Sequence, residues 1–284
     1  MKTELVMVTG SEGLIGTSLV KSLKRIGKKV IPVDYKLGSD LLEKETVKNL
    51  PDADIIIHLA GKTYIPSSWD DPFSMYSINI NTTLNMLEFA RKRNVKKFVF
   101  TSTYVYGKAQ YLPVDEKHPV SVSNPYTRSK LNCEDLCKGY CEDFNIPTVV
   151  LRLFNVYGPG QAQFFLIPTV ISQLLSHAIA LNDPRPKRDY VYISDVVRAL
   201  QLSIDFQTSK FEVFNIGSGV SYQVPEVVNL ILKISGAECD VIYKNSGRKN
   251  DVMDTVADIS KAKRLLKWEP KVPFEEGLRN MVPS

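Results

Sequence analysis

Short apolar segments that alternate with helical stretches constrain the fold of this chain more than any other feature. They occupy residues 4–9, 30–33, 54–58, 97–101 and 148–153. A strand that is buried on both faces carries a continuous apolar run, whereas a half-exposed strand alternates apolar and polar residues. The stretches between these segments carry apolar residues at helical spacing, as Leu19 and Leu23 do in the first. The alternation predicts an α/β fold built on a doubly wound parallel sheet.

A glycine-rich turn follows the first apolar segment. Gly10, Gly13 and Gly16 recur every three residues between the predicted strand and helix. Such a turn lets the backbone approach a pyrophosphate at the start of a helix. Asp34 ends the next strand, where a carboxylate accepts hydrogen bonds from ribose hydroxyls and repels a 2′-phosphate. The pattern predicts a nicotinamide dinucleotide site that favours NAD over NADP, although Lys36 nearby keeps NADP open.

The second half of the chain is less regular and indicates an additional lobe. Its predicted elements are helices near 164–178, 223–235 and 259–267 and a strand at 240–243. We therefore predict a Rossmann-like domain with a smaller C-terminal lobe that binds substrate. The predicted dinucleotide-binding domain covers residues 1–164, with 189–217 partly returning to it, and the predicted lobe covers 165–188 and 218–284.

Tyr126 and Lys130 form a candidate reactive pair. They lie four residues apart, so one helix would place both on the same face. Tyrosine has a pKa near 10, and acting as a base at neutral pH means lowering it by about three units, which a nearby ammonium favours. Ser102 follows a predicted strand at the sheet edge where ligands bind, so its hydroxyl could hold a substrate oxygen against Tyr126, with Thr103 sharing this role. The set predicts hydride chemistry on an alcohol or ketone.

Two further groups of chemically capable residues have a structural interpretation. His58 ends a buried strand beside apolar neighbours, which favours a packed residue over a catalyst. Cys133, Cys137 and Cys141 recur every four residues along one predicted helix, in a stretch without histidine. Packed thiols explain this stripe better than metal ligands do, and no metal is expected. Spacing alone leaves open whether the stripe faces the sheet or a partner chain.

The composition of the chain limits the classes of partner that it is expected to bind. The chain of 284 residues has a net charge of +5 and 44% hydrophobic residues, which is ordinary for a soluble globular protein. Its basic clusters close predicted helices and form no aromatic-interleaved groove, which disfavours nucleic-acid binding. No apolar run reaches the roughly 18 residues of a membrane span, and the start does not read as a signal peptide. We expect a cytoplasmic protein without a nucleic-acid or membrane partner.

Taken together, these motifs resemble the extended short-chain dehydrogenase/reductases, and among them the nucleotide-sugar epimerase/dehydratase family. The turn at 9–16 is similar to the family's TGxxGxxG, and residues 58–61 are similar to its second cofactor strand end. Ser102, Tyr126 and Lys130 match its catalytic set. Other matches lie around Asn79 and at 151–160, 188–195 and 214–217. The resemblance spans nearly the whole chain.

The resemblance also implies binding residues and partners. The implied cofactor contacts are Gly10, Gly13, Leu14, Ile15, Gly16, Asp34, Asp40, Leu41, Leu59, Ala60, Gly61, Asn79, Tyr126 and Lys130. The implied substrate contacts are Thr103, Asn155, Arg188 and Arg248, of which the last three match residues that hold the diphosphate or nucleotide of a sugar donor. The implied partner is a nucleotide-diphosphate sugar, and family members commonly form homodimers.

Departures from the family pattern separate the candidate reactions. Dehydratases of the family carry acids at the positions of Thr103 and Tyr104, and decarboxylases carry a Glu at the position of Tyr104. Without these acids, elimination lacks its proton carriers. The connection between Asp34 and Asp40 is short, as in the compact 4-ketoreductases of the family. Asp34 itself and the pattern at 102–107 favour an epimerase that retains NAD.

We therefore expect an NAD-dependent 4-epimerase acting on a nucleotide-diphosphate hexose by reversible hydride transfer at C4. The alternative is an NAD(P)H-dependent 4-reductase of 4-keto-6-deoxyhexoses carried on a nucleotide diphosphate. A non-catalytic dinucleotide sensor is a remote third interpretation, because Ser102, Tyr126 and Lys130 are all present. The sequence leaves the nucleotide and the sugar open.

Overall fold

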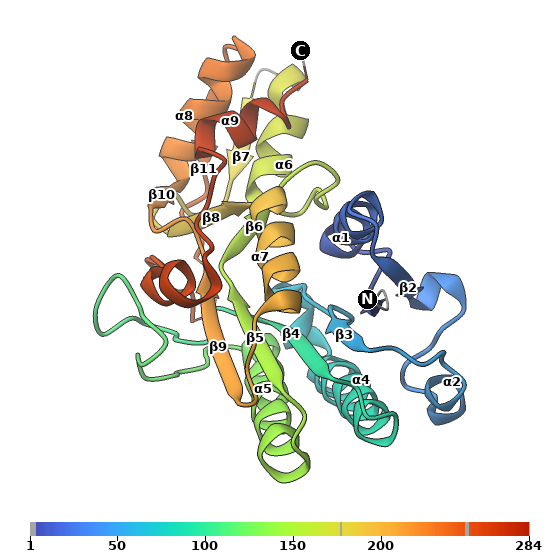
Figure 1. The fold of residues 1–284 in the computed structure, drawn as a ribbon. Helices are drawn as coiled ribbons and strands as arrows, with labels where there is room; N and C mark the ends of the chain where they lie inside the picture. Colours follow the sequence, from blue (N-terminus) through green and yellow to red (C-terminus); the bar gives the residue numbers. More distant parts are fainter. Residues whose placement is uncertain (1–3, 177, 248–249, 284) are drawn as a thin grey trace.

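A parallel sheet forms the centre of the molecule (Figure 1). The computed structural model describes residues 4–176, 178–247 and 250–283, and over these residues the main sheet has six strands in the order β2-β1-β3-β4-β5-β9. The strands are β1 (Leu5–Thr9), β2 (Lys29–Val33), β3 (Ile55–His58), β4 (Lys97–Thr103), β5 (Thr148–Leu153) and β9 (Phe211–Ile216). The strand order reverses between β1 and β3, so the carboxyl ends of these two strands flank the crevice where such sheets bind ligands.

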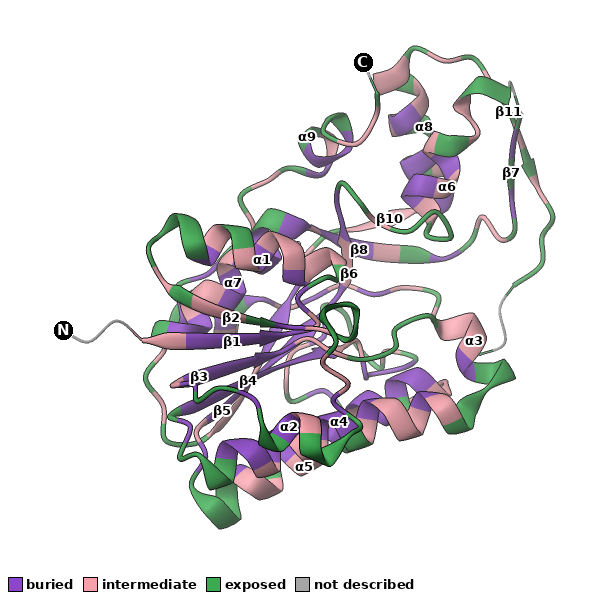
Figure 2. Cartoon of the chain, turned by 90° about the vertical axis from the view of Figure 1, so that its right-hand side faces the viewer, coloured by how far each residue is buried: buried purple, intermediate pink, exposed green. Residues whose placement is uncertain are grey.

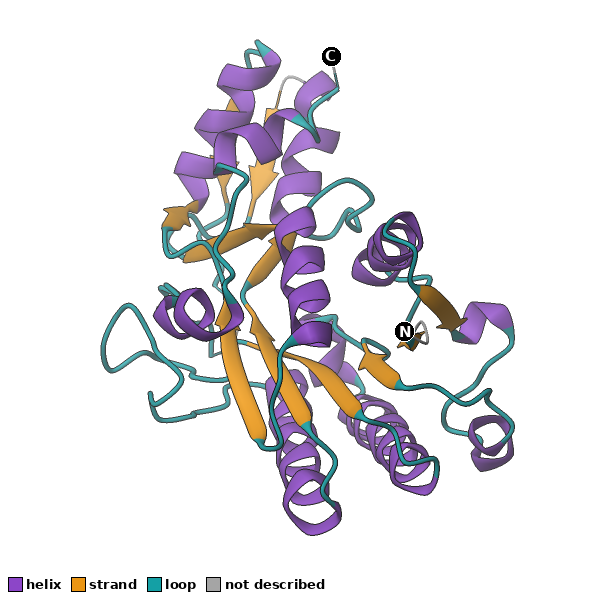
Figure 3. Ribbon diagram, viewed as in Figure 1, coloured by secondary structure: helices purple, strands orange, loops and turns teal. Residues whose placement is uncertain are grey.

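Helices cover both faces of this sheet (Figure 3). One face packs on α1 (Leu14–Arg25) and α7 (Ile193–Asp205), and the other packs on α4 (Pro72–Lys92) and α5 (Pro125–Phe144). Successive strand residues point to opposite layers, so Val6 and Val8 join the first core while Met7 joins the second. Both layers are buried, as the purple strands in Figure 2 show. This arrangement confirms the predicted doubly wound parallel sheet.

Smaller elements fill the connections and the C-terminal lobe. In the first half these are η1 (Tyr35–Leu37), α2 (Lys44–Lys48) and α3 (Ile65–Asp70). The lobe contains the sheet β10-β8-β6, formed by β6 (Asn155–Tyr157), β8 (Lys187–Tyr192) and β10 (Ser221–Gln223), and the pair β7 (Ala178–Leu181) and β11 (Asp240–Tyr243). Its helical elements are α6 (Leu166–Ser172), η2 (Leu174–Ser176), α8 (Val224–Ser235) and α9 (Phe274–Arg279), whereas η3 (Ala262–Leu266) packs into the core of the main sheet.

The lobe has its own hydrophobic core. Val227 and Ile231 of α8 are fully buried and pack with Ile179 of β7 and Phe274 of α9. The predicted helix at 164–178 is shorter than expected, because α6 ends at Ser172 and the chain then tightens into η2. The predicted helix at 259–267 is wound mostly as the π-helical turn η3. The domain boundaries given above stay a prediction.

The cysteine stripe of α5 faces the main sheet. Cys133 and Cys137 are fully buried in the core that contains Phe98 and Phe100 of β4, and Cys141 is 4% exposed. All three are free thiols. Burial in apolar surroundings raises the pKa of each thiol, which keeps it protonated and unreactive. The stripe therefore packs the helix against the sheet, which settles the orientation that spacing left open.

Candidate active site

A cavity of about 1170 Å³ opens at the carboxyl ends of the main-sheet strands and continues into the lobe. The predicted site residues that line it are Gly10, Gly13, Leu14, Ile15, Gly16, Asp34, Asp40, Leu41, Leu59, Ala60, Gly61, Ser102, Thr103, Tyr126, Lys130, Asn155 and Arg188. Asn79 lies behind the cavity wall, as described below. Arg248 lies outside the described residues. Residues far apart in the sequence thus meet at one site.

The glycine turn brings three backbone segments into contact. Gly10 has a φ of +68°, and a Cβ added there would lie 2.7 Å from the backbone nitrogen of Ala60. A Cβ on Gly16 would lie 2.1 Å from the carbonyl oxygen of Gly10. Gly13 precedes α1 without a side-chain cap, and the first turn of the helix holds no acidic residue. The helix start is therefore suited to an anion, and this cradle fits the pyrophosphate of a dinucleotide.

Asp34 is fixed in a defined orientation at the cavity rim. One carboxylate oxygen accepts a hydrogen bond from the backbone N–H of Lys36 at 2.9 Å, and the other accepts one from Glu12 at 3.0 Å. Each oxygen keeps a further lone pair for a ribose hydroxyl. A 2′-phosphate would meet this anchored negative charge, which fits NAD better than NADP.

Replacing Asp34 with Ser is expected to shift the cofactor preference towards NADP by at least tenfold. The substitution removes the anion that repels a 2′-phosphate and leaves the exposed Lys36 as a positive neighbour. The check is the ratio of NADH to NADPH affinities, measured by fluorescence titration. Asp40→Ser is the matched control, because Asp40 lines the same cavity and its loss should affect both cofactors alike. An unchanged ratio in Asp34→Ser would contradict the assignment.

His58 is a packed residue, as predicted. Its Nδ1 lies 2.7 Å from Thr9 Oγ1 and its Nε2 lies 3.2 Å from Thr83 Oγ1. Thr83 donates its hydroxyl hydrogen to the carbonyl of Asn79, so Nε2 of His58 carries the proton and donates to Thr83. Complete burial, reinforced by the charge of Lys130, lowers the pKa of His58 to about 3. The ring is therefore neutral and ties β3 to β1 and α4.

This histidine should make the protein less stable in mild acid. The pKa of His58 is about 3 in the folded protein and 6.5 ordinarily, so between these values only the unfolded chain binds the proton. The free energy of unfolding therefore falls as the pH drops below 6.5, by about 2 kcal/mol at pH 5. Urea unfolding of the wild type and His58→Asn at pH 7.5 and pH 5 checks this. An equal loss in both proteins would contradict the account.

The predicted reactive residues lie together around the first turns of α5. The helix begins with Asn124 as its cap and Pro125 in its first turn, as predicted. Tyr126 is 8% exposed and Lys130 is 4% exposed. The Oγ of Ser102 is buried and has no hydrogen-bond partner among the described residues. A substrate oxygen is the kind of partner that this hydroxyl lacks.

Burial drives both members of the reactive pair towards their neutral forms. It raises the pKa of Tyr126 to about 12, against the lowering effect of a hydrogen bond with Thr103. It also lowers the pKa of Lys130. The expected lowering of the pKa of Tyr126 is therefore not seen, because desolvation outweighs it. An ammonium close to a phenolate stabilises it, so the charge of Lys130 would favour ionisation of Tyr126 during a reaction.

Asn79 lies behind the wall of the cavity and holds two of the segments that form it. Its Oδ1 accepts from the backbone N–H of Lys62 at 2.8 Å, and its Nδ2 donates to the carbonyl of Lys62 at 3.1 Å and to Ser129 Oγ at 2.8 Å. Ser129 in turn donates to the carbonyl of Tyr126 at 2.8 Å. Asn79 thus joins the loop after β3 to the first turn of α5.

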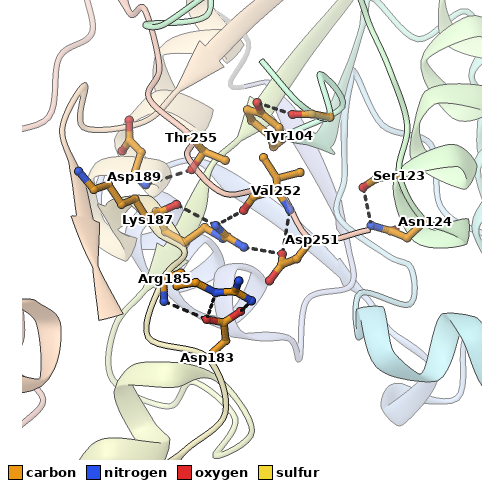
Figure 4. Close-up of polar contacts among 12 residues, drawn as sticks. Tyr104, Ser123, Asn124, Asp183, Arg185, Lys187, Asp189, Asp251, Val252 and Thr255 are labelled. Atoms are coloured by element: carbon orange, nitrogen blue, oxygen red, sulfur yellow. Dashed lines mark hydrogen bonds and ion pairs between the residues drawn. The ribbon is translucent and has the colours of Figure 1, made fainter. Parts of the chain in front are cut away.

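Of the predicted substrate residues, Asn155 and Arg188 lie on the lobe side of the cavity, on β6 and β8, whereas Thr103 ends β4 of the main sheet beside Tyr126. Arg188 donates to Asp251 Oδ1 at 2.6 Å and to the carbonyl of Val252 at 2.5 Å, contacts whose acceptors are drawn in Figure 4. Asn155 donates to the carbonyl of Asp189 at 3.3 Å. The sequence did not single out Asp251, because its role depends on a loop that only the fold brings to Arg188.

An aromatic contact at the cavity also escaped sequence analysis. Phe164 and Phe165, which line the cavity, pack with ring centroids 4.7 Å apart, and Phe164 packs on Tyr64 at 4.2 Å. These rings join the segment before α6 to the loop after β3. Two adjacent phenylalanines in an otherwise polar connection were the available signal.

Comparisons with known proteins identify the family. Residues 6–217 match the NAD dependent epimerase/dehydratase family. The chain belongs to this family. It is therefore an enzyme of the extended short-chain dehydrogenase/reductase type, as the sequence motifs predicted, and the expected NAD cofactor agrees with the family.

Solved structures and sequences of this family resemble the whole chain. A UDP-glucose 4-epimerase of Thermotoga maritima, crystallised with UDP-glucose, is 30% identical with a TM-score of 0.92, over 98% of this chain and 97% of that one. A UDP-glucose 4-epimerase of Thermus thermophilus, in complex with NAD, is 28% identical with a TM-score of 0.90, over the same shares. A GDP-6-deoxy-D-mannose reductase of Pseudomonas aeruginosa is 29% identical over 99% of this chain and 96% of its own length.

The described residues contain neither a membrane-spanning helix nor a metal-binding cluster. None of the helices in this part of the chain is long and apolar enough to cross a membrane. Within the same residues, no group of three or more His, Cys, Asp and Glu side chains could hold a metal ion.

Proposed function

We propose that this family member is an NAD-dependent 4-epimerase of a nucleotide-diphosphate hexose. The observation that carries the proposal is the unpartnered Ser102 hydroxyl in the same cavity as Tyr126, Lys130 and the glycine turn. Thr103 and Tyr104 stand where elimination would need acids, so the chain supplies one proton-transfer group and no second acid. The resemblance to UDP-glucose 4-epimerases supports the same reaction.

The chain's own residues handle the proton at C4. When bound, NAD supplies a nicotinamide ring that can accept and return a hydride. Ser102 holds the C4 oxygen, and the phenolate oxygen of Tyr126 takes the proton from the C4 hydroxyl and later returns it. Lys130 stabilises the phenolate with its ammonium charge, which is strong in this buried setting. Thr103 donates to or accepts from Tyr126 as the proton moves.

The lobe would hold the nucleotide diphosphate. Arg188 now donates to the carboxylate of Asp251, and a guanidinium in that position can donate to a phosphate with the same geometry. Asn155 and Arg188 line the cavity from β6 and β8 of the lobe. We assign them to the substrate, and propose UDP as the first nucleotide to test because UDP-glucose is present in the Thermotoga maritima relative.

One observation favours the reductase as the second candidate. The chain passes from edge strand β2 through the single turn η1 to Asp40, without the extra strand and helix usual in the family's epimerases. The likeness to the GDP-6-deoxy-D-mannose reductase supports this alternative. A reductase would use only the return step, with Tyr126 donating its proton to a 4-keto substrate. A homodimer and a cytoplasmic location stay predictions.

Deuterium-labelled substrate tests the proposal. The protein, without added cofactor, is incubated with UDP-glucose that carries deuterium at C4, and the products are followed by NMR. The epimerase assignment predicts UDP-galactose that keeps deuterium at C4, because the hydride leaves and returns within one site. UDP-N-acetylglucosamine and UDP-glucuronate are tested in parallel. Loss of the label to solvent, or oxidation of NADPH by a 4-keto-6-deoxy nucleotide sugar without epimerisation, would overturn the assignment.

A further inference from the structure

A buried ion pair lies directly below the reactive residues on α5. Tyr126, Lys130 and Glu134 follow one another at four-residue intervals, so they share one face of the helix. All three are buried, with exposures of 8%, 4% and 3%. This face packs against β4 and β5 of the main sheet, which lie beside α5 in Figure 1. Glu134 therefore places a carboxylate one helical turn from the ammonium of Lys130.

Arg152 of β5 holds this carboxylate in a two-pronged contact. Its Nε lies 3.1 Å from each oxygen of Glu134, and its Nη2 lies 2.6 Å from Oε2. The remaining Nη1 donates to the hydroxyl of Tyr106 at 2.9 Å, and Tyr106 donates to Asn215 at 2.6 Å. The guanidinium and the carboxylate thus satisfy each other and are tied to a second polar chain.

The same network is built into the strands that form the site. Arg152 is the register partner of Ser102 on β4 and of Asn215 on β9. The ion pair therefore sits in the layer of the sheet that carries the unpartnered serine hydroxyl. A displacement of Arg152 would therefore change the packing of α5 and the position of Ser102 at the edge of the cavity.

The side chain of Lys130, unlike that of Arg152, is not held in a two-pronged contact with a carboxylate of the described residues. Its ammonium is a compact charge on a flexible stem, which follows the nearest available carboxylate. It lies 4.5 Å from the ring centroid of Phe100, on the cavity wall. Of the other titratable groups near it, His58 is neutral and the thiols of Cys133 and Cys137 are protonated. Glu134 is therefore the anion that could draw the ammonium away from the cavity.

We propose that Arg152 is a positioning residue, which occupies the carboxylate of Glu134 so that Lys130 stays directed at Tyr126 and the cofactor ribose. This deepens the proposed function, because it rests on the role given there to Lys130 beside Tyr126 and on the cofactor contact that the family resemblance implies for Lys130. Removing the Arg152 guanidinium leaves the Glu134 carboxylate free to pair with the Lys130 ammonium. Removing the Glu134 carboxylate leaves the ammonium without a competing partner. The two halves of one ion pair should therefore differ in their effect on the cofactor.

The rate at which NADH leaves the full-length protein tests this, followed by its fluorescence after loading. Arg152→Met should release NADH at least tenfold faster than the wild type, the scale of one hydrogen bond from a charged group. Glu134→Gln and the double variant Arg152→Met with Glu134→Gln should stay within about threefold of the wild type. In a Lys130→Met background, Arg152→Met should have no further effect.

Lys261→Met is the matched control for the NADH release measurement. Lys261→Met removes a cation from the ion pair with Glu212, 2.8 Å long and away from the cavity, and should leave NADH release unchanged. Loss of NADH from Glu134→Gln as fast as from Arg152→Met would overturn the proposal, and so would an effect of Arg152→Met that persists without Lys130. If Arg152→Met does not fold, Glu134→Gln and the double variant decide, since rapid release from either contradicts the proposal. NADH release needs no nucleotide sugar, so the result is independent of the epimerase assignment.

Discussion

Replacing Tyr126 with Phe is expected to lower turnover at least a hundredfold, the usual scale for losing a positioned acid or base. The substitution removes only the hydroxyl oxygen, so the packing of this buried ring in the first turn of α5 is kept. The cofactor cradle is formed by other residues and should remain intact. The measurement is the steady-state rate with UDP-glucose, together with the NAD content of the purified variant.

Tyr104→Phe is the matched control for this prediction. Tyr104 directly follows β4, is half-buried, and donates its hydroxyl hydrogen to the carbonyl of Gly107 at 2.8 Å. Removing that hydroxyl should change turnover less than tenfold. If Tyr126→Phe, with its NAD retained, also lost less than tenfold, Tyr126 would not be the proton-transfer group.

Replacing Gly10 with Ala is expected to abolish cofactor retention. The added Cβ would lie 2.7 to 2.9 Å from backbone atoms of Leu59 and Ala60, so the ends of β1 and β3 must separate. Backbone atoms cannot move aside as a flexible side chain can, and the cradle for the pyrophosphate would be distorted. We expect the purified variant to contain less than a tenth of the NAD in the wild type, measured after denaturation.

Gly27→Ala separates steric contact from backbone strain. Gly27 has a φ of +78°, similar to that of Gly10, yet a Cβ there would have nothing within 4 Å. Both variants place an alanine in the left-handed region, which costs about 1 to 2 kcal/mol. Only Gly10→Ala should lose NAD. If both variants lost it equally, general destabilisation rather than the close approach to Ala60 would explain the result.

The main sheet was predictable because burial on both faces leaves a strong signal. The segments at β1, β3, β4 and β5 are nearly continuous apolar runs, and each was predicted to within a few residues. Of the strands of the lobe, β11 was predicted at residues 240–243, but the others carry no such signal. In β7, Ala178 and Ala180 are exposed while Ile179 is buried, a short alternation that a sequence window cannot distinguish from a loop. Strand β9 was missed as well, since its first three residues are half-buried.

The candidate site was predictable where residues carry a local motif. The glycine turn, Asp34 and the pair of Tyr126 with Lys130 could be found from their spacing together with the predicted strands around them, and the cavity brings them together. The ionisation of that pair could not, because the pKa of Tyr126 depends on how deeply the fold buries it. The contact of Arg152 with Glu134 could not be predicted from the sequence either, because it joins a strand to a helix through tertiary packing.

The nicotinamide nucleotide that the purified protein releases on denaturation tests the central claim most directly. Our account predicts nearly one NAD per chain, in a protein that forms the C4 epimer of its nucleotide sugar without added cofactor. A protein that releases no nicotinamide nucleotide, and that consumes NADPH with a 4-keto-6-deoxy nucleotide sugar, would contradict the epimerase assignment. In that case the short connection between Asp34 and Asp40 would mark a reductase.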